Sequence, residues 1–92
     1  MRGDVYMGCR FKALSDERRR TILAILGEND ASAGEIARRF SISQPTVSNH
    51  LKILKEAGLI TEQKIRQNRI YSLYKPGIHS VIETLKNIVK EA

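Results

Sequence analysis

The chain has 92 residues, which suits a single domain, and 41% of them are hydrophobic, as in a globular protein. No apolar run approaches the ~18 residues that span a bilayer, and no signal peptide is recognisable, so we expect no membrane insertion. A single cysteine excludes an intrachain disulfide and is consistent with a cytoplasmic location. The net charge of +6 favours an acidic partner such as nucleic acid.

Residues 1–10 contain two glycines and show no helical period, so we expect a flexible segment there and one folded domain over residues 11–92. Cys9 lies in this segment. Redox sensors usually pair an attacking cysteine with a resolving one, and Cys9 has no partner within the chain. It could still pair with its symmetry mate in a dimer, so a redox regulator based on Cys9 stays open as an alternative.

A first amphipathic helix is predicted from Asp16 to Leu26, with Ser15 as its N-cap and Gly27 at its end. Three arginines at positions 18–20 could form a second nucleic-acid patch. The apolar residues around them favour another interpretation, in which the arginines are divided between a solvated face and pairs with nearby acids.

Two helices separated by a short turn are the most informative part of the chain. The first is predicted over residues 33–40, and the second follows the turn at residues 41–43. Ser43 is a good N-cap, Pro45 suits the first turn, and Gly58 is predicted as a left-handed C-cap. Such a pair is typical of the helix-turn-helix arrangement, whose second helix enters the major groove of DNA. The alternative is an ordinary antiparallel helix pair.

The second of these helices has two chemically different faces. Val47, His50, Leu51 and Leu54 share one side. The opposite side carries hydroxyls, amides and one cation but no carboxylate, so it can approach a polyanion and hydrogen-bond to base edges. We predict base contacts from Gln44, Ser48 and Asn49. We predict phosphate or groove contacts from Ser43, Thr46 and Lys52.

A hairpin is predicted next, with strands at residues 61–65 and 69–74 and Asn68 as a left-handed turn residue. Cations cluster at its tip, which indicates a wing, a β-ribbon that contacts DNA beside the recognition helix. Arg66, Asn68 and Arg69 are its predicted DNA contacts. Residues 40–75 hold six cations and two acids, so +4 of the net charge of +6 lies in this half. A solvated hairpin, whose cations only maintain solubility, is the alternative.

The last helix is predicted from Ile78 onward and carries an apolar stripe that a small winged helix does not need for its own core. We interpret this stripe, together with apolar residues near residue 11, as a homodimer interface with twofold symmetry. The alternative is that the stripe only covers the core of its own chain. The predicted interface residues are Phe11, Leu14, Ile78, Val81, Ile82, Leu85, Ile88 and Val89.

The sequence Glu-Ile-Ala at residues 35–37, followed by Ser-Gln-Pro-Thr-Val-Ser-Asn-His-Leu-Lys-Ile-Leu-Lys-Glu-Ala-Gly-Leu-Ile at residues 43–60, resembles the core of the ArsR (arsenic-repressor) family. Residues 11–16 add to this resemblance, which covers roughly residues 10–75. It implies a mostly α fold with a small β-hairpin, a winged helix-turn-helix in the order ααααββα. It also implies a homodimeric repressor that binds an inverted-repeat, palindromic operator in double-stranded DNA and leaves it when a signal arrives.

Many members of this family sense metals, and two family sites can be checked. Alignment on residues 35–37 places Ser32 and Gly34 where the best-known site has cysteines, and neither residue binds a soft metal. The other site needs several ligands on the last helix, where His79 is the only imidazole. His79 and Glu83, doubled by symmetry, could hold zinc in principle. A lone exposed histidine is usually a surface residue, however, so we predict no metal and no cofactor.

The sequence shows no nucleophile–base pair, no glycine-rich phosphate loop and no paired acids, so an enzyme is not expected. A winged helix that serves only as a protein-interaction module is the other alternative. Such a module would be expected to have acids on its polar face, for example at Ser48 or Asn49. Because both metal sites are missing, we expect a non-metal signal: a regulatory protein partner, a change in protein level, or an organic or redox signal.

Overall fold

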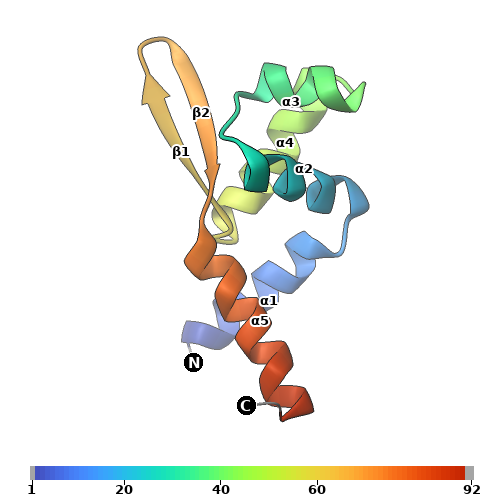
Figure 1. Cartoon of the computed structure of the whole chain (residues 1–92), viewed down its shortest axis with the longest axis vertical. Coiled ribbons are helices and arrows are strands. Elements are labelled where there is room, and N and C mark those ends of the chain that lie inside the picture. The colour runs from blue at the N-terminus through green and yellow to red at the C-terminus, as the bar shows by residue number, and fades with distance from the viewer. Residues whose placement is uncertain (1, 91–92) are drawn as a thin grey trace.

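The computed structural model describes residues 2–90, with side chains from residue 7 onward. The elements are α1 (Arg2–Leu14), α2 (Glu17–Glu28), α3 (Ala33–Phe40), α4 (Gln44–Glu56), β1 (Ile60–Ile65), β2 (Asn68–Leu73) and α5 (Lys75–Val89). This order is ααααββα, and the two strands form one antiparallel sheet, so the predicted winged helix-turn-helix is confirmed. In Figure 1 the hairpin and α3 lie at one end of the molecule, and α1 with α5 lies at the other.

The start of the chain differs from the expectation. Residues 2–10, predicted to be a flexible segment without a helical period, form most of α1, and the predicted boundary at residue 11 falls inside this helix. Among the described side chains of α1, only Ala13 is fully buried. Since α1 contributes so little to the core, its sequence carries almost no apolar period from which a helix could be predicted.

The ends of α2 also correct the prediction. Its N-cap is Asp16, whose carboxylate accepts hydrogen bonds from the backbone N–H groups of Arg18 and Arg19 at 2.8 and 3.2 Å. Ser15 instead donates its hydroxyl to the Lys12 carbonyl at 2.6 Å, at the end of α1. Gly27 does not end the helix, because α2 continues to Glu28.

Capping groups define the helix-turn-helix. Ser32 and Glu35 form a capping box at the start of α3, and Ser41 ends that helix in the left-handed conformation. The Ser43 hydroxyl caps α4, as predicted. Gly58 has a φ of +74°, and the N–H of Leu59 donates to the Leu54 carbonyl at 3.1 Å, so α4 ends in a Schellman motif.

The core lies where α2, α3, α4 and the base of the wing meet. Its largest fully buried side chains are Ile22, Ile36, Val47, Leu51, Leu54 and Leu59. The wing is attached to this core at both ends, because Ile60 is buried at the start of β1 and the backbones of Tyr71 and Ala31 exchange two hydrogen bonds of 2.8 and 3.1 Å. The base of the hairpin is therefore fixed, while its tip projects beyond the helices (Figure 1).

The turn of the hairpin is one residue earlier than predicted. The ladder pairs Ile65 with Asn68, so Asn68 is a strand residue and the two-residue tip is Arg66 and Gln67. Arg66, with a φ of +60°, takes the left-handed conformation that we expected at Asn68. Without a glycine in this segment, the sequence holds no strong marker of the turn position.

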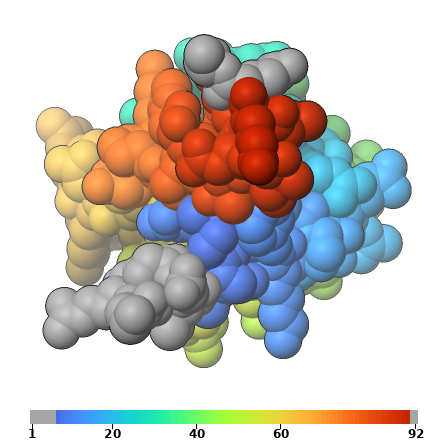
Figure 2. Space-filling model, turned by 90° about the horizontal axis from the view of Figure 1, so that it is seen from below, coloured from blue at the N-terminus to red at the C-terminus, as the bar shows by residue number. Residues whose placement is uncertain are grey.

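Helices α1 and α5 lie side by side and form one face of the molecule, as Figure 2 shows from below. No helix in the described part of the chain has the length and apolar character needed to span a membrane. At the upper end of α5, Gly77 is buried against the loop after α4. A Cβ at this position would meet the Gly58 carbonyl oxygen, so only glycine allows this close approach.

Candidate nucleic-acid interface

The two faces predicted for α4 are present. Val47, Leu51 and Leu54 are buried, and the opposite side is exposed to solvent. That exposed side carries Gln44, Ser48, Asn49 and Lys52. The helix therefore presents donors, acceptors and one cation outward on a buried apolar base, which is the arrangement that base-edge recognition in the major groove needs.

Two of the predicted contacts are already used in the start of α4. The Ser43 hydroxyl oxygen accepts from the Thr46 backbone N–H at 3.3 Å and shares a second hydrogen bond of 2.8 Å with the Thr46 hydroxyl. Thr46 is only half-exposed. These hydroxyls hold the first turn, and the free backbone N–H groups of that turn point along the helix axis, where the dipole favours a phosphate.

A polar groove of about 410 Å³ separates the recognition helix from the wing. It brings together four predicted contacts from two elements: Gln44 and Ser48 of α4, and Asn68 and Arg69 of β2. The rest of its lining consists of Ser32, Ala33, Gly34, Gln67 and Tyr71. Ser32 and Gly34 are the positions at which the sequence resemblance implies metal-binding cysteines in other family members; here Ser32 caps α3, and both residues line the groove.

The wing carries an ion-pair network that sequence reasoning missed. Glu62 on β1 accepts from the Lys55 ammonium at 3.0 Å and from the Arg69 guanidinium at 2.8 Å. The hydrogen bond from Lys55 lowers the pKa of Glu62 below its usual value, and the bond from Arg69 acts in the same direction. Arg66 and Arg69 are both exposed, but Arg69 is held by a carboxylate. Lys55 and Arg69 are each seven residues from Glu62 in the sequence, and this spacing does not predict an ion pair.

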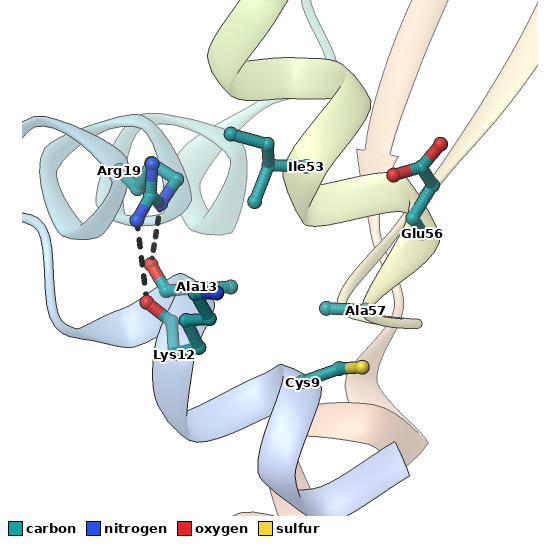
Figure 3. A pocket seen from close by; sticks show the side chains of 7 residues that line it. All are labelled: Cys9, Lys12, Ala13, Arg19, Ile53, Glu56 and Ala57. Carbon is teal, nitrogen blue, oxygen red and sulfur yellow. Dashed lines mark hydrogen bonds between the residues drawn. The ribbon is translucent and has the colours of Figure 1, made fainter. Parts of the chain in front are cut away.

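The inner side of α4 is tied to α1 and α2 through Arg19 and His50. The Arg19 guanidinium donates to the carbonyls of Ala13 and Lys12 at 2.7 and 3.2 Å, as Figure 3 shows, and its Nη1 lies 3.3 Å from Nδ1 of His50. A guanidinium only donates, so Nδ1 of His50 is the acceptor in this contact. His50 thus has the structural role predicted for it, and Arg19, a residue of α2, packs against the end of α1.

The Arg19 contacts border a shallow cavity of about 280 Å³ between α1 and the last turns of α4. Cys9, Lys12, Ile53 and Glu56 line its walls, and the Cys9 side chain lies below Ala57 in Figure 3. Cys9 is a free, exposed thiol. Its place on α1, rather than on a flexible segment, is the main structural fact that bears on a redox role.

The eight predicted interface residues fall into two groups. Val81 is only 6% exposed within its own chain, and Leu14 and Ile78 pack against the core, so these three already have intrachain partners. The other five are exposed on the face that α1 and α5 form: Phe11, Ile82, Leu85, Ile88 and Val89. Within the described residues, no three histidine, cysteine or acidic side chains are grouped to hold a metal ion.

Comparisons with known proteins agree with this geometry. Residues 16–62 match the model of the family described as bacterial regulatory protein, arsR family. The chain is 41% identical to the transcriptional repressor SdpR of Bacillus subtilis over 81 residues, which cover 88% of this chain and 90% of SdpR. It is 36% identical to the transcriptional activator HlyU of Vibrio cholerae, with coverage of 88% of this chain and 75% of HlyU.

Solved structures extend the match to the whole fold. An ArsR-like transcriptional regulator from Rhodococcus sp. RHA1 superposes with a TM-score of 0.88 at 30% identity, over 98% of this chain and 85% of that one. The matched proteins are transcriptional regulators, which are not enzymes, so the prediction that this chain is not an enzyme is confirmed. The chain belongs to the arsR family of bacterial regulatory proteins.

Proposed function

We propose that this DNA-binding transcriptional regulator acts in the cytoplasm as a homodimeric repressor on an inverted-repeat operator, from which a non-metal signal releases it. The observation that carries the proposal is the exposed, acid-free face of α4 beside the polar groove and the wing. In this arrangement Gln44 and Asn49 would contact base edges, with Ser48 between them. Lys52 and Arg66 would neutralise phosphates on either side.

The exposed apolar side chains of α5 and α1 support the proposed dimerisation. Ile88 and Val89 are 72% and 66% exposed, and Leu85 is 49% exposed. In a monomer these side chains would remain exposed to water, together with those of Ile82 and Phe11. Twofold pairing through this face would present two recognition helices, which an inverted repeat matches.

Selection of binding sites from random duplexes tests the proposal directly. The selected DNA should contain an inverted repeat, and sedimentation should show two protomers on each bound duplex. Selected sites without symmetry, or bound monomers, would reject the homodimer. Failure to enrich any sequence would instead favour the protein-interaction module.

The sign of regulation needs its own test, because SdpR is named a repressor and HlyU an activator. We propose repression, as in SdpR, the more similar of these two relatives. Transcription in vitro from a promoter that contains the selected site should fall when the protein is added. An increase would assign activation and leave the DNA-binding proposal intact.

A further inference from the structure

Glu62 is the only acidic side chain in the wing, and it connects three elements. Its carboxylate joins Lys55 near the end of α4, through Oε1, to Arg69 on β2, through Oε2, while Glu62 itself belongs to β1. The Glu62 side chain is 13% exposed, whereas those of Lys55 and Arg69 are 55% and 67% exposed. The acid is thus enclosed beneath two cations that reach toward solvent.

This arrangement has two physical consequences. A carboxylate that accepts from both partners occupies donor groups that would otherwise be available to DNA phosphates. It also links the recognition helix to the wing by side chains, beyond the packing at the base of the hairpin. Because the pKa of Glu62 lies below its usual value, the carboxylate is ionised at neutral pH and both consequences apply there.

We propose that Glu62 is a specificity-determining positioning residue, which withholds Lys55 and Arg69 from indiscriminate phosphate binding and holds the wing in register with α4. The proposal rests on the proposed function, because it assumes that the wing contacts DNA. Glu62, an acid in the basic half of the chain, would thus lower the total affinity for DNA and increase the discrimination between operator and random sequences. Base contacts from α4 then contribute a larger share of the binding free energy.

The substitution Glu62→Gln tests this proposal, since it preserves the size of the side chain and removes its charge. Each cation released onto a phosphate should steepen the slope of log K against log salt by about 0.9, hence by up to about 3.6 for a dimer that releases two per protomer. Even one additional phosphate contact raises affinity about eightfold at 0.1 M salt. We therefore expect tighter binding to random DNA and a lower ratio of operator to random affinity.

Glu56→Gln is the matched control. It removes the same charge from the same half of the chain, but within the described residues Glu56 makes no ion pair and no hydrogen bond through its side chain. It should leave the salt slope within about 0.3 of the unsubstituted protein, because it releases no cation. Thermal unfolding of both variants reports whether the fold is retained.

The outcomes separate clearly. A steeper slope and a lower affinity ratio for Glu62→Gln than for Glu56→Gln support the proposal, and the extra slope should fall by about half in the Lys55→Met/Glu62→Gln variant. Equal behaviour of the two single variants overturns it. Equal weakening on operator and random DNA without a change of slope also overturns it, because Glu62 would then only stabilise the hairpin. If the unsubstituted protein selects no operator, the proposed function fails instead.

Discussion

Replacing Ile88 by serine should dissociate the proposed dimer without unfolding the protomer. Complete burial of an isoleucine side chain contributes about 1.5–3 kcal/mol. Ile88 is still 72% exposed in the single chain, so its burial against a second copy would contribute about 1–2 kcal/mol per protomer. Because a twofold interface buries Ile88 of both protomers, the substitution should weaken dimerisation by about 2–4 kcal/mol. The dimer dissociation constant should then rise by about 30- to 700-fold.

Sedimentation equilibrium measures this constant, and circular dichroism checks that the variant keeps its helices. Ile53→Ser is a suitable control, because Ile53 is also an exposed isoleucine, at 38%, but lies on α4 outside the face of α1 and α5. It should leave the dissociation constant unchanged. If Ile88→Ser and Ile53→Ser give the same constant as the unsubstituted protein, the apolar stripe of α5 is not the interface and the reasoning is refuted.

Other predictions concern DNA binding and its control. Gln44→Ala and Asn49→Ala should each weaken operator binding by about 1–3 kcal/mol and random DNA much less; equal losses on both in a gel shift would contradict direct base contacts. Arg66→Ala should lower the salt slope by about 0.9 per protomer, and an unchanged slope would mean that the wing tip does not contact phosphate. Zinc, cadmium or arsenite at modest excess should not release DNA, and release at micromolar or tighter affinity would reject a non-metal signal. Arg10→Met should weaken operator binding at least tenfold with little effect on dimerisation, and the opposite pattern would assign Arg10 to the dimer interface.

The helix-turn-helix could be predicted in detail because its local signals agree with each other. Ser43 caps α4 by its own hydroxyl, and Gly58 takes the left-handed conformation that few other residues adopt easily. The apolar side of α4 has a helical period because it enters the core. Each of these features depends on residues that are close in sequence, so a single chain shows them.

The sequence predictions for α1, the hairpin turn and the N-cap of α2 were wrong because tertiary contacts, not local sequence signals, determine these features. α1 has almost no apolar period, because arginine side chains and backbone carbonyls make many of its contacts. The left-handed φ of Arg66 is imposed by the ladder on both sides of the turn. Asp16 and Ser15 are both good N-cap residues, and only the position of α1 decides between them. The pairs of Glu62 likewise depend on how the hairpin folds against α4.

Hydrogen bonds connect the proposed dimer face to the end of the recognition helix. Arg10 on α1 donates from Nε to the Ala57 carbonyl, at the end of α4, at 2.9 Å, and from Nη1 to the Ser80 hydroxyl, on α5, at 2.6 Å. Ser80 in turn donates to the Gly77 carbonyl at 2.9 Å, and Gly77 leaves no space for a side chain between α5 and the loop at Gly58. The end of α4 is therefore fixed to both helices of the face. Because closely packed contacts of this kind have little free volume, we expect a displacement of α5 relative to α1 to be transmitted to the end of α4. We therefore infer that a signal acting on the proposed dimer face would reach the recognition helix through these contacts, and Arg10→Met tests this link.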